Sequence, residues 1–171
     1  MIGGLLAVIL IAAGALLTWG GTFANNQVKD QLAAQKITLP TATHNPKEGA
    51  DVTAFFAANG GKLMTTGKQA QMYADHYIAF HLTGIGAGKV YSELSGQEMG
   101  LKAQLAANPK NAALAAQVAA LDGQVNTVFK GESLRGMLLN AYAFWQLGQI
   151  AMIASWVSYL GGLIFLILAL L

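Results

Sequence analysis

The stretch that decides the fold of this chain is GMLLNAYAFWQLGQIAMIASWVSYLGGLIFLILALL, residues 136–171, which contains no charged side chain. A second uncharged stretch, MIGGLLAVILIAAGALLTWGGTFANNQV, forms residues 1–28, so all 10 Lys and Arg and all 8 Asp and Glu lie between Lys29 and Arg135. A helix of about 20 apolar residues crosses the hydrocarbon core of a bilayer. The charge distribution therefore predicts an all-α membrane protein. Two transmembrane helices, one at each end, flank a small and mainly helical extramembrane domain.

The domain boundaries follow from the same distribution. We expect transmembrane helix 1 in residues 1–28, a helical domain in residues 29–135 and a long transmembrane helix 2 in residues 136–171. As a helix the last stretch is roughly 54 Å long, against a hydrocarbon core of about 30 Å, so part of it projects beyond the bilayer. Apolar side chains there would need a cover. The residues that we expect to contact a partner are Leu138, Tyr142, Phe144, Trp145 and Trp156.

A cleaved signal peptide is the alternative for residues 1–28. Such a peptide starts with basic residues and has an apolar core of about 7–15 residues. Here no Lys or Arg precedes the apolar run, and the run is longer than that. We therefore expect a retained anchor in the plasma membrane. Charge in a segment as long as residues 29–135 does not decide its orientation; our interpretation places both ends in the cytoplasm and the central domain outside it.

The central domain is expected to be helical on the evidence of caps and apolar spacing. Thr66 is a good N-cap for a helix that continues to Leu82. A second helix is expected over residues 92–107, and a third that starts at the pair Asn108-Pro109. Residues 38–62 are expected to form a loop with at most a short turn at residues 52–57, because they show little periodicity.

A helix–helix seam is predicted in the third of these helices. Apolar residues recur there at spacings of four and three, which is typical of one helix packing along another. The stripe is too short for a free coiled coil, so it predicts a hairpin that packs on its neighbours. Gly131 marks an expected bend before the second membrane segment. The stripe consists of Leu114, Val118, Leu121, Val125 and Val128.

Motifs that would carry chemistry are weak. The glycine cluster at residues 84–88 precedes Lys89 but lacks the first Gly and the Ser or Thr of a phosphate-binding loop. His76 and His81 are five residues apart, about 140° around a helix, and His44 lies on a distant loop, so no metal site is expected. There is no Cys, and Lys alternates with acidic residues rather than forming a basic patch. We expect no enzyme, cofactor, metal or nucleic-acid partner.

The two membrane segments each carry a face of small residues. Membrane helices associate through close backbone approach over such faces, because lipid tails are as apolar as Leu. We therefore expect specific helix packing, with the lipid bilayer and other integral membrane subunits as partners. The expected packing residues are Gly3, Ala7, Gly14, Thr18 and Gly21 in the first segment, and Gly148, Ala151, Ser155, Ser158 and Gly162 in the second.

Several short segments carry a resemblance. They are Thr18-Trp19, Asp30–Ile37, Tyr73–Asp75, Gly88–Leu94, Ser133–Gly136 and Ala141–Phe144. Together they resemble a family of uncharacterised actinobacterial two-span membrane proteins, over most of the chain. Members of similar sequence are sometimes labelled aromatic-ring-opening dioxygenases, but such an enzyme needs a converging His/His/Glu-type iron site, which this sequence does not offer. The resemblance implies a fold and a location in the cell envelope, and no activity.

Three functional hypotheses follow from these patterns. The first is a non-enzymatic accessory or stabilising subunit of a larger membrane complex, which acts through helix–helix and domain contacts. The second is a membrane-anchored extracytoplasmic sensor or ligand-binding module, which requires polar groups to converge around residues 73–91. The third is a membrane enzyme, which requires a cofactor that no motif announces. The empty catalytic inventory favours the first hypothesis.

Overall fold

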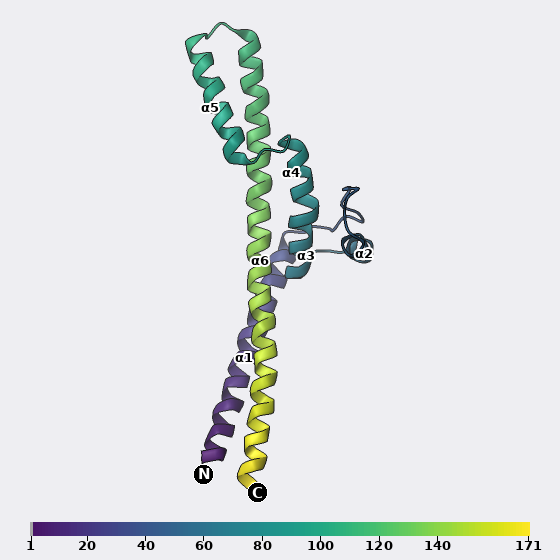
Figure 1. The fold of residues 1–171 in the computed structure, drawn as a ribbon, viewed down its shortest axis with the longest axis vertical. Coiled ribbons are helices and arrows are strands. Elements are labelled where there is room, and N and C mark those ends of the chain that lie inside the picture. Colours follow the sequence, from purple (N-terminus) through teal and green to yellow (C-terminus); the bar gives the residue numbers. More distant parts are fainter. Residues whose placement is uncertain (1) are drawn as a thin grey trace. The chain divides into compact units, whose positions relative to one another are not determined.

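The computed structural model describes residues 2–171 and shows an all-α chain, as the sequence predicts. Figure 1 labels its helices along the chain. Among these residues, β structure is limited to one isolated antiparallel bridge between Thr38 and Leu63. The elements are α1 (Ile2–Ala34), α2 (Ala50–Asn59), α3 (Gly67–Met72), the π-helix η1 (Tyr73–Ile78), α4 (Ala79–Ile85), α5 (Tyr91–Ala107) and α6 (Ala112–Leu170).

Helices α1 and α6 are long and apolar enough to cross a membrane, which confirms the predicted apolar helix at each end of the chain. They contain 33 and 59 residues. A core helix of a soluble protein would be mostly buried. Only 11% of the apolar window of each of these helices is buried within the chain. Their large apolar side chains therefore face an environment that the chain itself does not supply.

The chain divides into two compact units. Unit 1 comprises Met1–Thr38, Leu63–Ala70 and Asn140–Leu171, and unit 2 comprises Leu39–Lys62 and Gln71–Leu139. Helix α6 contributes its C-terminal part to unit 1 and its N-terminal part to unit 2.

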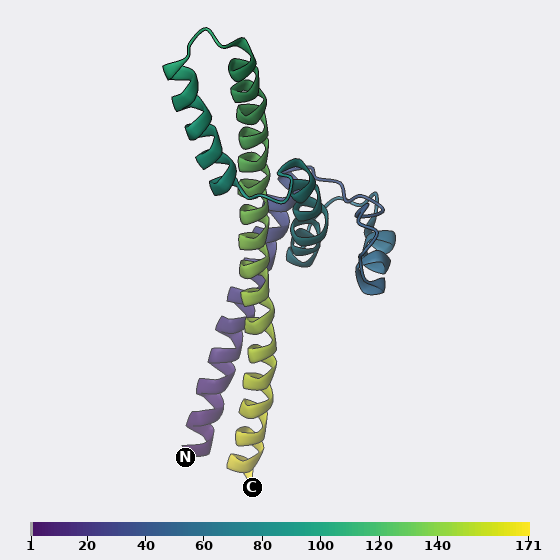
Figure 2. The same cartoon turned by 45° about the horizontal axis from the view of Figure 1, so that its top comes forward.

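In unit 1, α1 runs antiparallel to the C-terminal part of α6, with the two chain ends at the same end of the pair (Figures 1 and 2). Residues 63–70 also belong to unit 1 and pack with this helix pair. The Met64 N–H donates to the Ile37 carbonyl at 2.8 Å, and the Met64 side chain is fully buried. Gly67 packs directly on Trp145, because a Cβ added to Gly67 would overlap the Trp145 side chain. Trp145 of α6 is therefore partly covered by residues 63–70 of the same chain.

The helix that begins at Gly67 has the predicted N-cap. The Thr66 hydroxyl accepts the Gln69 N–H at 3.2 Å, while the Gln69 side-chain oxygen accepts the Thr66 N–H at 3.1 Å. This reciprocal pair is a capping box, which satisfies N–H groups that the first helical turn leaves without partners. The helix continues through α3, η1 and α4 to Ile85, three residues beyond its expected end.

In unit 2, α5 packs against the N-terminal part of α6, which confirms the predicted hairpin. Their shared core consists of Leu94, Val125 and Val128, with Tyr91 and Leu121 packed against it. Lys102 of α5 donates to Asp122 of α6 at 3.0 Å and pairs with Glu98 on its own helix. Apolar residues at four–three spacing thus meet one partner helix, as in a short coiled coil.

Two predictions about helix starts in unit 2 are wrong. Residues 50–59 form α2 rather than a loop, because Phe56 is fully buried and tertiary packing outweighs weak periodicity. The third helix begins at Ala112, and not at Asn108-Pro109. Asn111 is its N-cap: the Asn111 side-chain oxygen accepts the Leu114 N–H at 3.0 Å. Asn108 instead follows the last turn of α5, and its N–H donates to the Gln104 carbonyl at 3.0 Å.

The bend predicted at Gly131 does not exist. Helix α6 continues through it without interruption. Gly131 lies against Leu82 of α4, and a Cβ at this position would overlap the Leu82 side chain. The glycine therefore permits close approach of two helices, and its backbone keeps helical geometry.

Candidate functional site

The predicted small faces of α1 and α6 meet each other in unit 1. The buried small residues on α1 recur every seven residues, as do those on α6. A sustained seven-residue repeat keeps one face of each helix toward the other along a left-handed supercoil. A Cβ on Gly21 would lie 2.9 Å from the Gly148 carbonyl oxygen, so these backbones are in direct contact. The residues are Ala7, Gly14 and Gly21 on α1, and Gly148, Ser155 and Gly162 on α6.

Hydrogen bonds connect the same two helices. The Thr18 hydroxyl donates to the Gly14 carbonyl at 2.8 Å, and its oxygen lies 3.2 Å from the Tyr159 hydroxyl of α6. Because Thr18 uses its only proton on Gly14, the Tyr159 hydroxyl is the donor in this pair. Near the other end of the pair, the Gln149 side-chain N–H donates to the Asn25 oxygen at 2.9 Å. Side-chain hydrogen bonds across apolar helices stabilise the register of the pair.

The other expected packing residues lie along this seam or beside it. Gly3 lies against Ala169: a Cβ added to Gly3 would lie 3.4 Å from the Ala169 Cβ. Ala151 and Ser158 are half-buried. Tyr159 packs over Gly14, at 2.7 Å from the position of an added Cβ, although the sequence pattern did not single it out.

The five residues that we expected to contact a partner differ in their exposure. Leu138 is 3% exposed and therefore covered within the chain. Tyr142 and Trp145 are half-buried and stack with ring centroids 6.1 Å apart. Phe144 and Trp156 are 56% and 66% exposed. Of the five, Phe144 and Trp156 therefore leave the most surface for contact with lipid or another protein.

A different cluster forms in unit 2, where two neighbouring sets of contacts join the connection before α2 to η1 and α4. We name it the histidine cluster and define it by His44, Glu48, His76, Tyr77 and His81. His44 and Glu48 belong to the connection before α2, and the other three to η1 and α4. The His44 ring lies 6.2 Å from that of His81 and 6.4 Å from that of Tyr77. Two segments 28 or more residues apart in sequence therefore meet here.

The π-helix positions one side of the histidine cluster. The Tyr73 and Tyr77 rings stack at 5.0 Å with planes 13° apart, and the Tyr77 and His81 rings are 4.3 Å apart. His81 Nδ1 lies 2.7 Å from the Tyr77 carbonyl. A carbonyl can only accept, so Nδ1 carries the proton and Nε2 is the remaining acceptor of the neutral ring. Burial, and then the neighbouring Tyr77, raise the pKa of the Tyr73 phenol.

A hydrogen bond holds the other side. The His76 Nδ1–H donates to Glu48 Oε2 at 3.0 Å, and Glu48 Oε1 accepts the Asn45 side-chain N–H at 3.1 Å. Next to it, Asp75 pairs with Arg135 of α6 at 3.1 Å. Arg135 Nε also donates to the Ala74 carbonyl at 3.2 Å, so α6 is tied to the π-helix by both backbone and side chain.

Metal binding at these histidines finds no geometric support. Within residues 2–171, no three His, Asp or Glu side chains come close enough to share an ion. His76 faces Glu48, and His81 faces His44 and Tyr77, so His76 and His81 serve different contacts. The expectation that the three histidines bind no metal stays a prediction.

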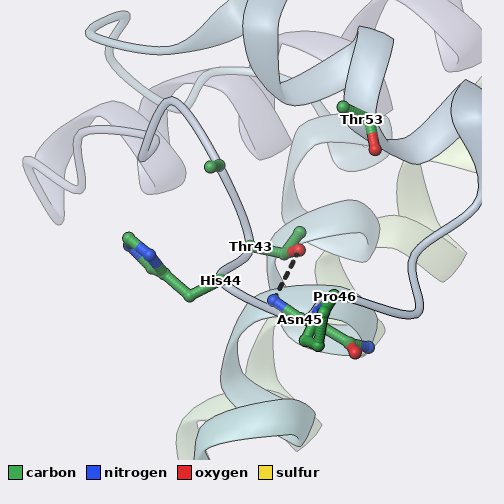
Figure 3. Close-up of a pocket in the computed structure, with 6 residues that line it drawn as sticks. Thr43, His44, Asn45, Pro46 and Thr53 are labelled. Atoms are coloured by element: carbon green, nitrogen blue, oxygen red, sulfur yellow. Dashed lines mark hydrogen bonds between the residues drawn. The ribbon is translucent and has the colours of Figure 1, made fainter.

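A pocket lies beside the histidine cluster, on the connection before α2 (Figure 3). Its volume is about 290 Å³, near the lower end of small-molecule sites. The Thr43 hydroxyl accepts the Asn45 N–H at 3.3 Å, as the dashed line in Figure 3 shows, and the His44 ring extends away from Pro46. The lining residues are Ala42, Thr43, His44, Asn45, Pro46 and Thr53.

No protein-family profile, curated protein or solved structure matches this chain. The resemblance to actinobacterial two-span membrane proteins therefore stays a prediction.

Proposed function

We propose that this chain is a membrane-anchored, non-enzymatic binding or sensor module, held in the plasma membrane by α1 and α6, which acts through its histidine cluster. The observation that carries this proposal is a pair of contacts between the connection before α2 and the segment η1–α4: His44 lies against Tyr77 and His81, and Glu48 bonds His76. It supplies the convergence of polar groups that a sensor requires, and that spacing along the sequence did not predict.

The paired helices support the anchor. Contacts extend from Gly3–Ala169 at one end to Asn25–Gln149 at the other. From Gly3 to Asn25, over 22 residue-to-residue steps, α1 rises about 33 Å, close to the roughly 30 Å of the hydrocarbon core. Tyr142 and Trp145 then fall just beyond the hydrocarbon, where aromatic residues are enriched. Interfacial aromatic residues need no partner protein.

The histidine cluster supports binding rather than architecture alone. A core that only stabilised the fold would use apolar side chains, whose burial carries no desolvation penalty. Here the His76, Tyr77 and His81 side chains remain partly exposed around a π-helix, a backbone form that is frequent at functional sites. Partly exposed imidazole and phenol groups offer donors, acceptors and flat faces to a ligand.

Native mass spectrometry of the chain extracted in polymer-bounded lipid particles tests the proposal. The wild type is expected to carry a bound species other than lipid. The double variant His44→Ala, His81→Ala is expected to lose it. The matched control Lys89→Ala, Lys110→Ala changes two exposed side chains outside the cluster and should keep it. A wild-type chain that carries lipid alone, in a fold confirmed by circular dichroism, would contradict the proposal.

The accessory-subunit hypothesis is the second candidate, and it rests on the exposure of Phe144 and Trp156. The small-residue faces and Trp145, which the sequence offered as further contact sites for a partner, are in contact within the chain. The small faces of α1 and α6 are occupied by each other, and Trp145 is covered by Gly67. Under this hypothesis Phe144→Ala with Trp156→Ala should release the chain from a complex while it stays in the membrane. A chain that runs as a monomer in mild detergent, with no associated protein, would rule this candidate out.

A further inference from the structure

Both His76 and His81 contact the connection before α2, although an α-helix would point them apart. Two residues five positions apart in an α-helix lie about 140° apart around its axis. In the structure the His76 side chain bonds Glu48, and the His81 ring lies against His44. His44 and Glu48 belong to the same short connection, so their helix presents both histidines to it.

The π-helix η1 accounts for this presentation. It covers Tyr73–Ile78, and the Ala79 N–H bonds the Ala74 carbonyl five residues earlier. Because a π-helix closes its turn with i→i+5 bonds, it holds more residues per turn than an α-helix, and each residue advances by a smaller angle. Part of the chain between His76 and His81 lies in this turn. The angle between the two histidines is therefore smaller than the α-helical value.

Arg135 of α6 bonds the π turn at two consecutive residues. Its Nε–H donates to the Ala74 carbonyl at 3.2 Å, and its Nη2–H donates to Asp75 Oδ1 at 3.1 Å. A carbonyl oxygen has two lone pairs, so the Ala74 carbonyl accepts from Ala79 and from Arg135 at once. π-Helices are rare in proteins, which indicates that such a turn needs support beyond its own backbone bonds. The guanidinium supplies that support.

We propose that Arg135 is the positioning residue of the histidine cluster: its bond to the Ala74 carbonyl holds the π turn that presents His76 and His81 to the connection before α2. This inference rests on the proposed function, because it names the residue that shapes the same site. The planar guanidinium presents its N–H groups in a fixed fork, so that one side chain holds the backbone carbonyl and the neighbouring Asp75 carboxylate together.

Nuclear magnetic resonance of the full chain in lipid nanodiscs tests the positioning role. The chain has 3 histidines, so labelling this residue type gives few ring signals, which single His→Gln variants assign. The His44 and His81 rings meet edge to face with centroids 6.2 Å apart. The wild type should therefore show a nuclear Overhauser contact between the protons of these two rings. Methyl signals of the α5–α6 core report whether a variant is folded.

Three variants make the result specific. Arg135→Met keeps an unbranched side chain without N–H donors, so the π turn loses its support and the contact between His44 and His81 should be lost. Asp75→Asn keeps an oxygen acceptor and leaves the bond to the Ala74 carbonyl in place, so it should keep the ring contact. Lys130→Met is the matched control, because it makes the same kind of change at an exposed position of α6, and it should also keep the contact.

The outcomes separate the positioning role from the proposed function. A ring contact that is absent from the wild type, survives Arg135→Met or disappears equally in Lys130→Met would overturn the positioning role. Loss of the contact in Asp75→Asn would overturn it too, because the ion pair would then hold the turn. In each of these cases a bound species in native mass spectrometry would leave the proposed function standing. Loss of the contact in Arg135→Met alone, on a chain that carries only lipid, would keep the positioning role and contradict the binding proposal.

Discussion

Substitution of Gly21 by Ala tests the contact between α1 and α6 most directly. A Cβ at Gly21 would lie 2.9 Å from the Gly148 carbonyl oxygen and 2.9 Å from Met152 Cγ. Met152 can change its rotamer, but a helix backbone oxygen cannot rotate away, so the two helices must shift apart at the Gly148 carbonyl. Overpacking of this kind costs about 1–3 kcal/mol.

The neighbouring Gly20 is the matched control. A Cβ at Gly20 meets nothing within 4 Å. Replacing Gly by Ala favours the helix by about 1 kcal/mol at either position, so this term cancels in the comparison. We therefore expect Gly21→Ala to have a free energy of unfolding about 1–3 kcal/mol below that of Gly20→Ala.

Unfolding by sodium dodecyl sulfate in mixed micelles measures this difference. Because the chain has no Cys, Ile2→Cys and Leu170→Cys supply the only thiols for a donor and an acceptor dye. Energy transfer between the ends should be lost at a lower detergent fraction in Gly21→Ala than in Gly20→Ala. Equal midpoints for the two variants would refute the close approach of α1 and α6 at this level.

Three further predictions concern single contacts. Gly67→Ala should expose Trp145 and shift tryptophan emission to longer wavelength, whereas Gly49→Ala, which meets nothing within 4 Å, should not; equal spectra would contradict the packing of Gly67 on Trp145. Asn111→Ala should weaken the start of α6 by about 1 kcal/mol and speed exchange of its first amides, while Asn108→Ala should leave them unchanged. The pKa of Tyr73 is raised above its ordinary value of 10.0, mainly by burial, so the folded state favours the neutral phenol. Tyr73 therefore does not reduce the stability of the fold below pH 10, and the fold loses stability as the pH rises through the folded pKa of Tyr73. Tyr73→Phe removes this ionisation and should reduce the alkaline loss of near-ultraviolet circular dichroism.

The two long apolar helices were predictable from sequence because hydropathy is a local property. A run of uncharged residues has the same preference for an apolar environment whatever surrounds it. The small residues on α1 and α6 were equally visible, since their spacing places them on one face. Which surface each face contacts was not visible. The structure pairs Gly21 with Gly148, although the pattern alone allowed a partner protein equally well.

The starts of the helices were only partly predictable from the sequence. Thr66 and Gln69 form a cap within four residues, and the sequence indicated the helix start at Thr66 correctly. Asn108 and Asn111 are both good cap residues, and only the hydrogen bond to the Leu114 N–H distinguishes them. Helix α2 was missed because its stability depends on the burial of Phe56, which is a tertiary contact.

The histidine cluster was decided by tertiary structure alone. His44 and Glu48 meet His76, Tyr77 and His81 only because the connection before α2 lies on the π-helix. No local pattern encodes that contact, since it joins segments 28 or more residues apart. The sequence by itself thus determined which parts of the chain avoid water, through the free energy of apolar transfer. The long-range fold determined which polar groups face one another, because hydrogen bonds and ion pairs require distances that spacing along a chain does not set.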